Sequence, residues 1–228
     1  NFKNQVLKLF NITPDIDLSI MDNCRDISDV TANIILKLRD EFKSMRPDVV
    51  LVHGDTATTL GASLAAFYAK IPIGHVEAGL RTYNLSSPWP EEANRQIVSR
   101  LASYHFAPTE ANKLNLINEG ISSERLYVTG NTVIDALNFT LKNLNKSKKL
   151  QAKAVASLRS VGLRIDTNFE KYVLITCHRR ENFGQDLEQI CLAIQELAIL
   201  LPELHFVFPV HLNPSIKEPV SVALSNIN

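Results

Sequence analysis

The sequence has few cysteines, no excess of charge of either sign and no long hydrophobic run. Its three cysteines have no CxxC spacing, so the sequence predicts neither a zinc ribbon nor a disulfide framework. The 24 basic and 24 acidic residues cancel, which argues against a broad basic surface for nucleic acid. The apolar runs are far shorter than a membrane span. We therefore expect a cytoplasmic protein with reduced thiols and neither a nucleic-acid nor a membrane partner.

Two nucleotide-binding motifs are also absent. The sequence contains neither GxGxxG nor GxxxxGK[ST], so it predicts neither a dinucleotide-dependent redox enzyme nor a Walker-type nucleotidase, and we expect no cofactor. The pairs His53-x-Asp55 and His75-x-Glu77 could each offer two metal ligands, which leaves a metallohydrolase as an alternative. No Asn-His pair or Gly-His-x-His loop completes such a site, so we expect no metal.

What is present is an alternation of strand-like and helix-like segments. Short apolar runs alternate with segments whose apolar residues recur at helical spacing, as in residues 27–44. The expected strands are 49–52, 71–76, 104–107, 126–129, 172–176 and 205–208. This alternation predicts a parallel sheet covered by helices. The continuous apolar run 49–52 is typical of a strand buried on both faces.

The segment 145–149, Asn-Lys-Ser-Lys-Lys, is polar, basic and without periodicity. After it the strand–helix pattern starts again. We therefore predict two domains, residues 1–145 and 146–228, with the linker between them.

Polar residues follow the expected strands at several places. In parallel α/β sheets, ligands bind beyond the carboxyl ends of the strands, where Asp55 and Glu77 lie. Asp55 could instead be the N-cap of the next helix, and Glu91 could merely complement a helix dipole. Glu77 is followed by Ala-Gly rather than by a helix start, which favours a functional carboxylate. His178, flanked by two arginines, suits an anionic group such as a phosphate, although plain surface charge is the alternative.

Six motifs in series resemble a known family. They are VHGDT (52–56), HVEAGLR (75–81), PEEANR (90–95), VTGNTVIDAL (128–137), HRRENFG (178–184) and PVHLNP (209–214). Together they resemble the bacterial non-hydrolysing UDP-N-acetylglucosamine (UDP-GlcNAc) 2-epimerases over essentially the whole chain. The resemblance implies two Rossmann-like domains of the glycosyltransferase-B type, both incomplete here, because the chain begins without Met and lacks the family's N-terminal Gly-Thr-Arg-Pro-Glu loop and its C-terminal Ser-Gly-Gly-x-x-Glu-Glu segment.

The resemblance also implies an activity and a site. The family interconverts UDP-GlcNAc and UDP-N-acetylmannosamine (UDP-ManNAc) for surface polysaccharides, by UDP elimination to 2-acetamidoglucal and re-addition. Active-site positions of the family match Asp55, Glu77, Glu91 and His178, of which Asp55, Glu77 and His178 also bind substrate. Arg179 and His211 match positions that contact a second, activating UDP-GlcNAc in some members. The family further implies a homodimer.

The missing diphosphate and uridine contacts imply little or no activity for the isolated 228 residues. Other functions stay open at this point: a hydrolysing 2-epimerase, a glycosyltransferase of the same fold, or an inactive nucleotide-sugar-binding remnant. The residue patterns do not say which carboxylate is the acid and which the base.

Overall fold

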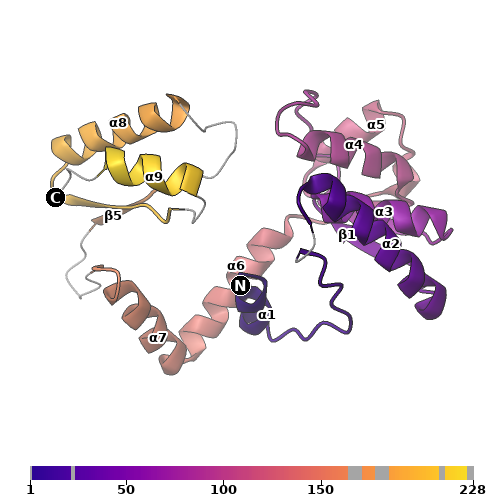
Figure 1. Ribbon diagram of the computed structural model, residues 1–228, viewed down its shortest axis with the longest axis horizontal. Helices are drawn as coiled ribbons and strands as arrows, with labels where there is room; N and C mark the ends of the chain where they lie inside the picture. The colour runs from indigo at the N-terminus through magenta and orange to yellow at the C-terminus, as the bar shows by residue number, and fades with distance from the viewer. Residues whose placement is uncertain (1, 22–23, 164–170, 178–184, 211–213, 225–228) are drawn as a thin grey trace. The chain divides into compact units, whose positions relative to one another are not determined.

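The computed structural model describes residues 2–21, 24–163, 171–177, 185–210 and 214–224. The chain forms two compact units, residues 1–142 and 143–228, which are described separately (Figure 1). The division lies close to the predicted boundary at residue 145. That these units correspond to the two Rossmann-like domains of the resemblance stays a prediction.

The first unit alternates helices and strands in the order α1–α2–β1–α3–β2–α4–β3–α5–β4–α6. Their bounds are Phe2–Phe10, Ile27–Met45, Val50–His53, Ala57–Tyr68, Ile73–Val76, Glu91–Leu101, Tyr104–Ala107, Glu110–Asn118, Leu126–Val128 and Thr132–Lys146. Helix α6 crosses the division between the units. The parallel α/β architecture expected from the alternation is confirmed.

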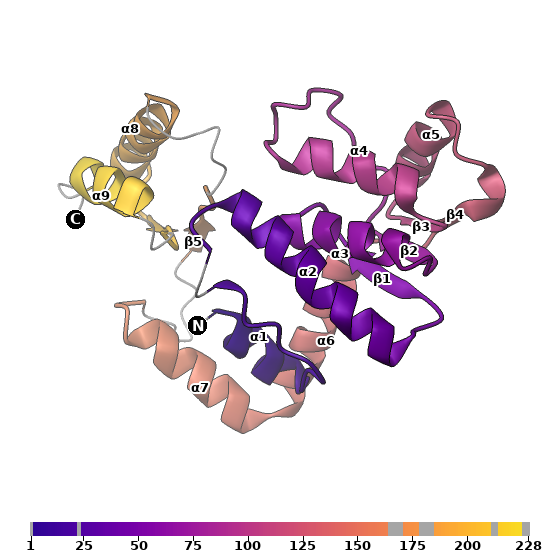
Figure 2. The ribbon, with the colours of Figure 1, turned by 45° about the vertical axis from the view of Figure 1, so that its right-hand side comes forward.

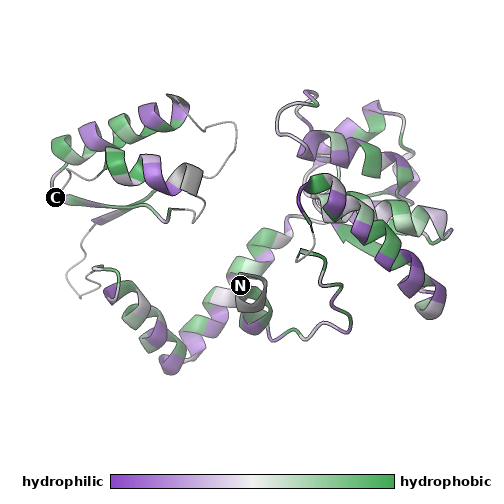
Figure 3. Ribbon diagram, in the orientation of Figure 1, coloured by the Kyte–Doolittle hydropathy of each residue, from purple (hydrophilic) through white to green (hydrophobic). Residues whose placement is uncertain are grey.

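The four strands form one parallel sheet in the order β1-β2-β3-β4. A crossover between adjacent parallel strands is right-handed, so strands that follow one another in chain order have their connecting helices on one face. The core agrees: Val52 and Ile73 of the sheet pack with Ala66 of α3 and Val98 of α4. Helix α2 lies alongside α3 (Figure 2), and both hydrophobic and hydrophilic residues run along it (Figure 3).

The opposite face of this sheet differs from the sequence expectation. Leu51, in the middle of β1, is 65% exposed, and Tyr104 and Tyr127 on β3 and β4 are also exposed. The prediction that β1 is buried on both faces is therefore wrong for the described residues. The apolar run describes only the composition of the strand. Burial depends on what packs on each face of the sheet, and the described residues cover one of its two faces.

The predicted linker 145–149 contains the end of one helix and the start of the next. Helix α6 continues to Lys146, and α7 (Lys148–Arg159) begins directly after Ser147, whose hydroxyl accepts a hydrogen bond from Leu150 N. A serine N-cap thus starts a new helix within the segment that the polar composition indicated as a linker.

The second unit contains the two parallel strands β5 (Lys171–Leu174) and β6 (Leu204–Val207) with helices α8 (Gln185–Leu200) and α9 (Pro214–Ala223). Leu187, Cys191 and Val220 form its buried core. Among the described helices of either unit, none has the length and apolar character needed to cross a bilayer.

Candidate active site

The carboxyl ends of β1 and β2 lie side by side, and Gly54 directly follows β1 there. Gly54 has φ +72°, a conformation that glycine adopts without steric cost. Its N–H donates to the Val76 carbonyl over 3.0 Å, and its own carbonyl lies 2.8 Å from His75 Nε2. Because a carbonyl only accepts, Nε2 carries the imidazole proton. Hydrogen bonds from β2 thus fix the start of the loop that carries Asp55.

Asp55 is not the helix N-cap. The residue that caps α3 is Thr56, whose hydroxyl accepts from Thr59 N, so the capping alternative is wrong. The Asp55 carboxylate is one-quarter exposed and lies 3.4 Å from Arg95 Nη1, while its backbone carbonyl accepts a 2.7 Å hydrogen bond from Asn94 Nδ2. Asp55 is therefore held from α4 at the edge of the site, with its carboxylate accessible.

Glu77 follows β2 directly and has an unusual backbone. Its φ of +67° lies in the left-handed region, which is uncommon and costly for a residue with a side chain. A Cβ atom built on Gly54 would lie 3.5 Å from Glu77 Oε2, so the Glu77 carboxylate lies over the turn that precedes Asp55. The structure thus brings two of the predicted carboxylates, Asp55 and Glu77, to one place.

Glu91 and Glu92 begin α4 but have different surroundings. Glu91 is the first residue of the helix and is half-buried. Glu92 is fully buried and accepts hydrogen bonds from Thr82 N, Tyr83 N, Gln96 Nε2 and Arg95 Nε. Burial alone would raise the pKa of Glu92, but the hydrogen bonds from Gln96 and the two amides, with the Arg95 charge, hold that pKa below its usual value. Glu92 is therefore held inside the protein by its hydrogen bonds, whereas Glu91 is partly exposed at the start of the helix.

Arg81 fixes the loop between Glu77 and α4. Its side chain is fully buried and makes two bonds to Glu119, of 2.6 and 2.9 Å, and one to Ser99 Oγ of 2.9 Å. Bidentate pairs of this kind orient both partners. The end of α5 thereby anchors the HVEAGLR segment that carries Glu77.

Two histidines lie beneath the site. His75 and His105 are register partners on β2 and β3, and both are fully buried. Burial lowers the pKa of His75 to about 4, although the bond to Gly54 opposes it. Burial, with the neighbouring charges of His75, Arg125 and Arg81, lowers the pKa of His105 to about 4. Both rings are therefore neutral at physiological pH.

The sequence predictions singled out Glu91 from the PEEANR motif and missed Asn94 and Arg95. These two residues contact Asp55 directly, and their signal was helical spacing, since Glu91 and Arg95 are four apart and share one face of α4. His178, Arg179 and His211 lie outside the described residues. Among the described residues, no cluster of three or more His, Cys, Asp or Glu side chains could hold a metal ion.

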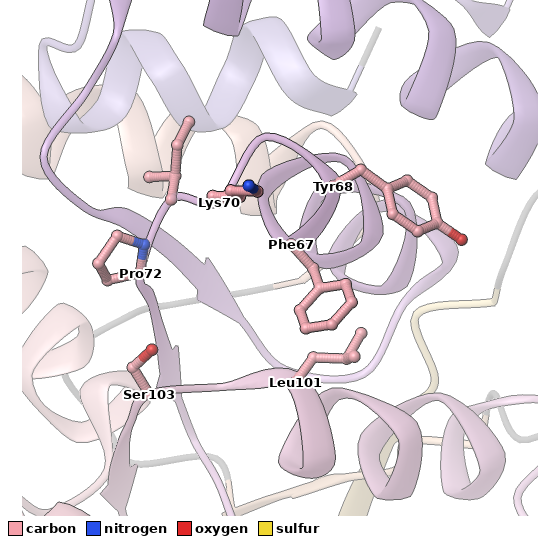
Figure 4. Close-up of a pocket in the computed structure, with 7 residues that line it drawn as sticks. Phe67, Tyr68, Lys70, Pro72, Leu101 and Ser103 are labelled. Atoms are coloured by element: carbon pink, nitrogen blue, oxygen red, sulfur yellow. The ribbon is translucent and has the colours of Figure 1, made fainter.

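A pocket at the opposite ends of the strands differs from this site in its lining. It has a volume of about 580 Å³ and lies at the amino ends of β2 and β3, lined by residues that include Phe67, Lys70, Pro72 and Leu101 (Figure 4). Its lining is mainly apolar and contains no carboxylate. The carboxylates of Asp55 and Glu77 lie instead beyond the carboxyl ends of β1 and β2.

Comparison with known proteins gives a consistent result. The family model described as UDP-N-acetylglucosamine 2-epimerase matches residues 1–228. The UDP-N-acetylglucosamine 2-epimerase of Neisseria meningitidis is 50% identical over 225 residues, which are 99% of this chain and 59% of that protein. The enzyme of that name from Escherichia coli K12 is 48% identical over 224 residues, 98% of this chain and 58% of that protein. This chain thus spans about three-fifths of the length of these relatives.

Solved structures agree with the curated relatives. The crystal structure of UDP-GlcNAc 2-epimerase from N. meningitidis bound to UDP-GlcNAc matches with a TM-score of 0.92 at 50% identity, over 99% of this chain and 59% of that chain. The Methanocaldococcus jannaschii enzyme in complex with UDP-GlcNAc and UDP matches with a TM-score of 0.74 at 30% identity, over 97% of this chain and 56% of that one. The fold expected from the resemblance is confirmed.

Proposed function

The chain belongs to the UDP-N-acetylglucosamine 2-epimerase family, and on that premise we propose that it takes part in the reversible epimerisation of UDP-GlcNAc to UDP-ManNAc. The proposal depends on one observation: the Glu77 carboxylate lies next to Gly54, the residue before Asp55, beyond the carboxyl ends of β1 and β2. Glu77 is held there in a strained conformation, which is typical of functional sites.

The chemistry requires carboxylates near C1 and C2 of the sugar. No carbonyl is attached to C2, so its hydrogen is not acidic until the anomeric C–O bond to UDP breaks. Breaking that bond leaves an oxocarbenium-like C1, and loss of the C2 proton gives 2-acetamidoglucal. UDP then adds back to C1 while C2 takes a proton on the opposite face. The path needs a base, an acid and nearby negative charge.

Three carboxylates serve this chemistry in the proposal: Asp55, Glu77 and Glu91. Asp55 and Glu77 flank the Gly54 turn, while Glu91 lies one helical turn before Arg95, which reaches Asp55. Asp55 and Glu77 also bind the substrate. His178 is the fourth catalytic and substrate-binding residue, and it stabilises or protonates the departing diphosphate.

The proposed function includes activation by a second substrate molecule and assembly into a dimer. Arg179 and His211 contact a second UDP-GlcNAc that acts as an activator. The protein works as a cytoplasmic homodimer and serves the synthesis of surface polysaccharide precursors. Light scattering of the purified protein tests the dimer, and a sigmoidal dependence of rate on UDP-GlcNAc tests the activator.

Solvent deuterium exchange is the decisive experiment. The complete gene product carrying this sequence, incubated with UDP-GlcNAc in D₂O, is expected to place deuterium at C2 of both UDP-GlcNAc and UDP-ManNAc. Glu77→Gln is expected to abolish the exchange, and Arg39→Gln, at an exposed position of α2, to leave it unchanged. Sugar transfer without C2 exchange would indicate a glycosyltransferase, and release of free ManNAc a hydrolysing 2-epimerase.

Isolated residues 1–228 are expected to show little deuterium exchange at C2, since this chain spans about three-fifths of the length of its relatives. Comparison of this polypeptide with the complete gene product measures the difference. Equal turnover numbers would contradict the expectation.

A further inference from the structure

Arg95 and Glu92 form a buried ion pair for which the proposed chemistry has no direct role. The side chain of Arg95 is 8% exposed and that of Glu92 is 0% exposed, with 2.7 Å between Arg95 Nε and Glu92 Oε2. Such a pair often adds no stability over apolar side chains of similar size, because both charges lose their hydration. Its contacts, rather than its burial, therefore indicate its role.

The contacts run from a loop to Asp55. Glu92 accepts from the backbone N–H groups of Thr82 and Tyr83, at 3.0 and 3.1 Å, and so binds the start of the loop 82–90. The same carboxylate fixes Arg95 Nε. Because the guanidinium is planar and rigid, fixing Nε also sets the direction of Nη1, which lies 3.4 Å from Asp55 Oδ2.

Helix α4 holds Asp55 a second time through its backbone. Asn94, next to Arg95, donates from Nδ2 to the Asp55 carbonyl over 2.7 Å, and Asn94 is itself buried. Two adjacent residues of α4 thus hold the backbone and the carboxylate of one residue. Proton transfer needs the carboxylate within about 3 Å of the proton's carbon or oxygen, so its orientation matters as much as its presence.

We propose that Arg95, held by Glu92, is a positioning residue that orients the Asp55 carboxylate and links it to the loop 82–90. The inference rests on the proposed function, because it assigns Asp55 a reacting role. Arg95 acts through Asp55, so its loss impairs the chemical step more than substrate binding.

Kinetics of the complete gene product test the role. Arg95→Gln is expected to lower kcat by roughly 10- to 100-fold, as misplacing a reacting group does, with KM changed much less. Arg95→Lys keeps the charge but not the two-pronged geometry, so it restores only part of kcat. Arg39→Gln, which removes an exposed ion pair with Asp40 on α2, is the control and keeps wild-type kcat.

Chemical rescue separates positioning from general damage. Guanidinium ion at non-denaturing concentration is expected to raise the kcat of Arg95→Ala and to leave the kcat of Arg39→Ala unchanged. An unchanged kcat in Arg95→Gln would overturn the proposal, as would a raised KM at constant kcat, which would make Arg95 a substrate-binding residue instead.

A double-mutant cycle keeps this inference separate from the proposed function. Asp55→Asn and Arg95→Gln are each expected to lower the midpoint of unfolding. In the double variant the two decreases are expected to be non-additive, because the two side chains interact. Glu92 keeps three other hydrogen-bond donors in Arg95→Gln, so this variant is expected to fold. If the wild-type protein shows no C2 exchange, the proposed function fails, but the cycle still tests whether Arg95 interacts with Asp55. Additive decreases would overturn the role of Arg95.

Discussion

At the scale of single residues, Glu77 shows how a side chain can be placed at a cost in backbone energy. Its left-handed φ of +67° is one that glycine would adopt freely. The residue after β2 must turn sharply toward Ala78, which is fully buried, and the carboxylate comes to lie over Gly54 as a result. The strain is thus tied to where the carboxylate points.

The strain at Glu77 predicts a difference between two variants that both lack the carboxylate. Glu77→Gly is expected to be about 1 kcal/mol more stable than Glu77→Ala, because only glycine relieves the left-handed conformation. Urea unfolding measures the difference, and both variants are expected to lack C2 exchange. Equal stability of the two would show that the backbone at Glu77 is unstrained.

The neighbouring carboxylates Glu91 and Glu92 are expected to separate activity from stability. Glu92→Gln weakens the bond to buried Arg95 and is expected to cost about 3 kcal/mol of unfolding free energy. Glu91→Gln, at a half-buried position, is expected to change stability by less than about 0.5 kcal/mol and to abolish epimerisation. Denaturation and exchange assays on both variants check this, and the reverse pattern would contradict the assignment of Glu91 as the reactive residue.

At the scale of elements, the segment after β2 is fitted against helix α5. Asn115 Nδ2 donates to the Gly79 carbonyl over 3.0 Å, and a Cβ atom on Gly79 would lie 2.2 Å from the Asn112 carbonyl oxygen. Backbone therefore approaches backbone at Gly79. The position of the loop that carries Glu77 depends on this contact and on the Arg81–Glu119 pair.

Two glycines with similar backbone angles provide a test of that contact. Gly79→Ala, with φ +88°, meets the α5 backbone and is expected to cost more than about 3 kcal/mol of unfolding free energy. Gly120→Ala has φ +83° but nothing within 4 Å of the added Cβ, so only the roughly 1 kcal/mol of backbone strain is expected. Similar losses in the two variants would argue against the close packing.

At the scale of the whole molecule, the buried histidines couple folding to pH. The folded pKa values of His75 and His105, about 4, lie below the ordinary value of 6.5, so the unfolded chain binds more protons between these limits. Their contribution to stability is complete above pH 6.5 and is lost as the pH falls toward 4. Each ring contributes up to roughly 3 kcal/mol to that dependence.

Unfolding of the protein by urea at several pH values tests this coupling. Stability is expected to fall steadily from pH 7 to pH 4.5, and His105→Gln, which cannot titrate, is expected to reduce the slope. His205→Gln is the control, since His205 is exposed and lies in the second unit. A pH-independent stability across this range would show that the rings are not buried neutral in the folded protein.

The sequence by itself determined the parallel α/β class, the approximate strands and helices, and the family, because apolar periodicity and ordered motifs are local properties of the chain. It also singled out Asp55 and Glu77, since strand ends carry the ligand sites of such sheets. It did not decide that Thr56 rather than Asp55 caps α3, that a new helix starts at Ser147, or that the described residues cover β1 on one face.

Only the tertiary structure decided how Glu91 and Glu92 differ in their surroundings and what holds Asp55. The family resemblance singled out Glu91, and the rotation of α4 turns its neighbour Glu92 into the protein. The contacts of Arg95 and Asn94 with Asp55 join residues about 40 positions apart. Such pairs form when helix and sheet pack together. The spacing within α4 places Arg95 on one face with Glu91, but it does not specify Asp55 as the partner of Arg95.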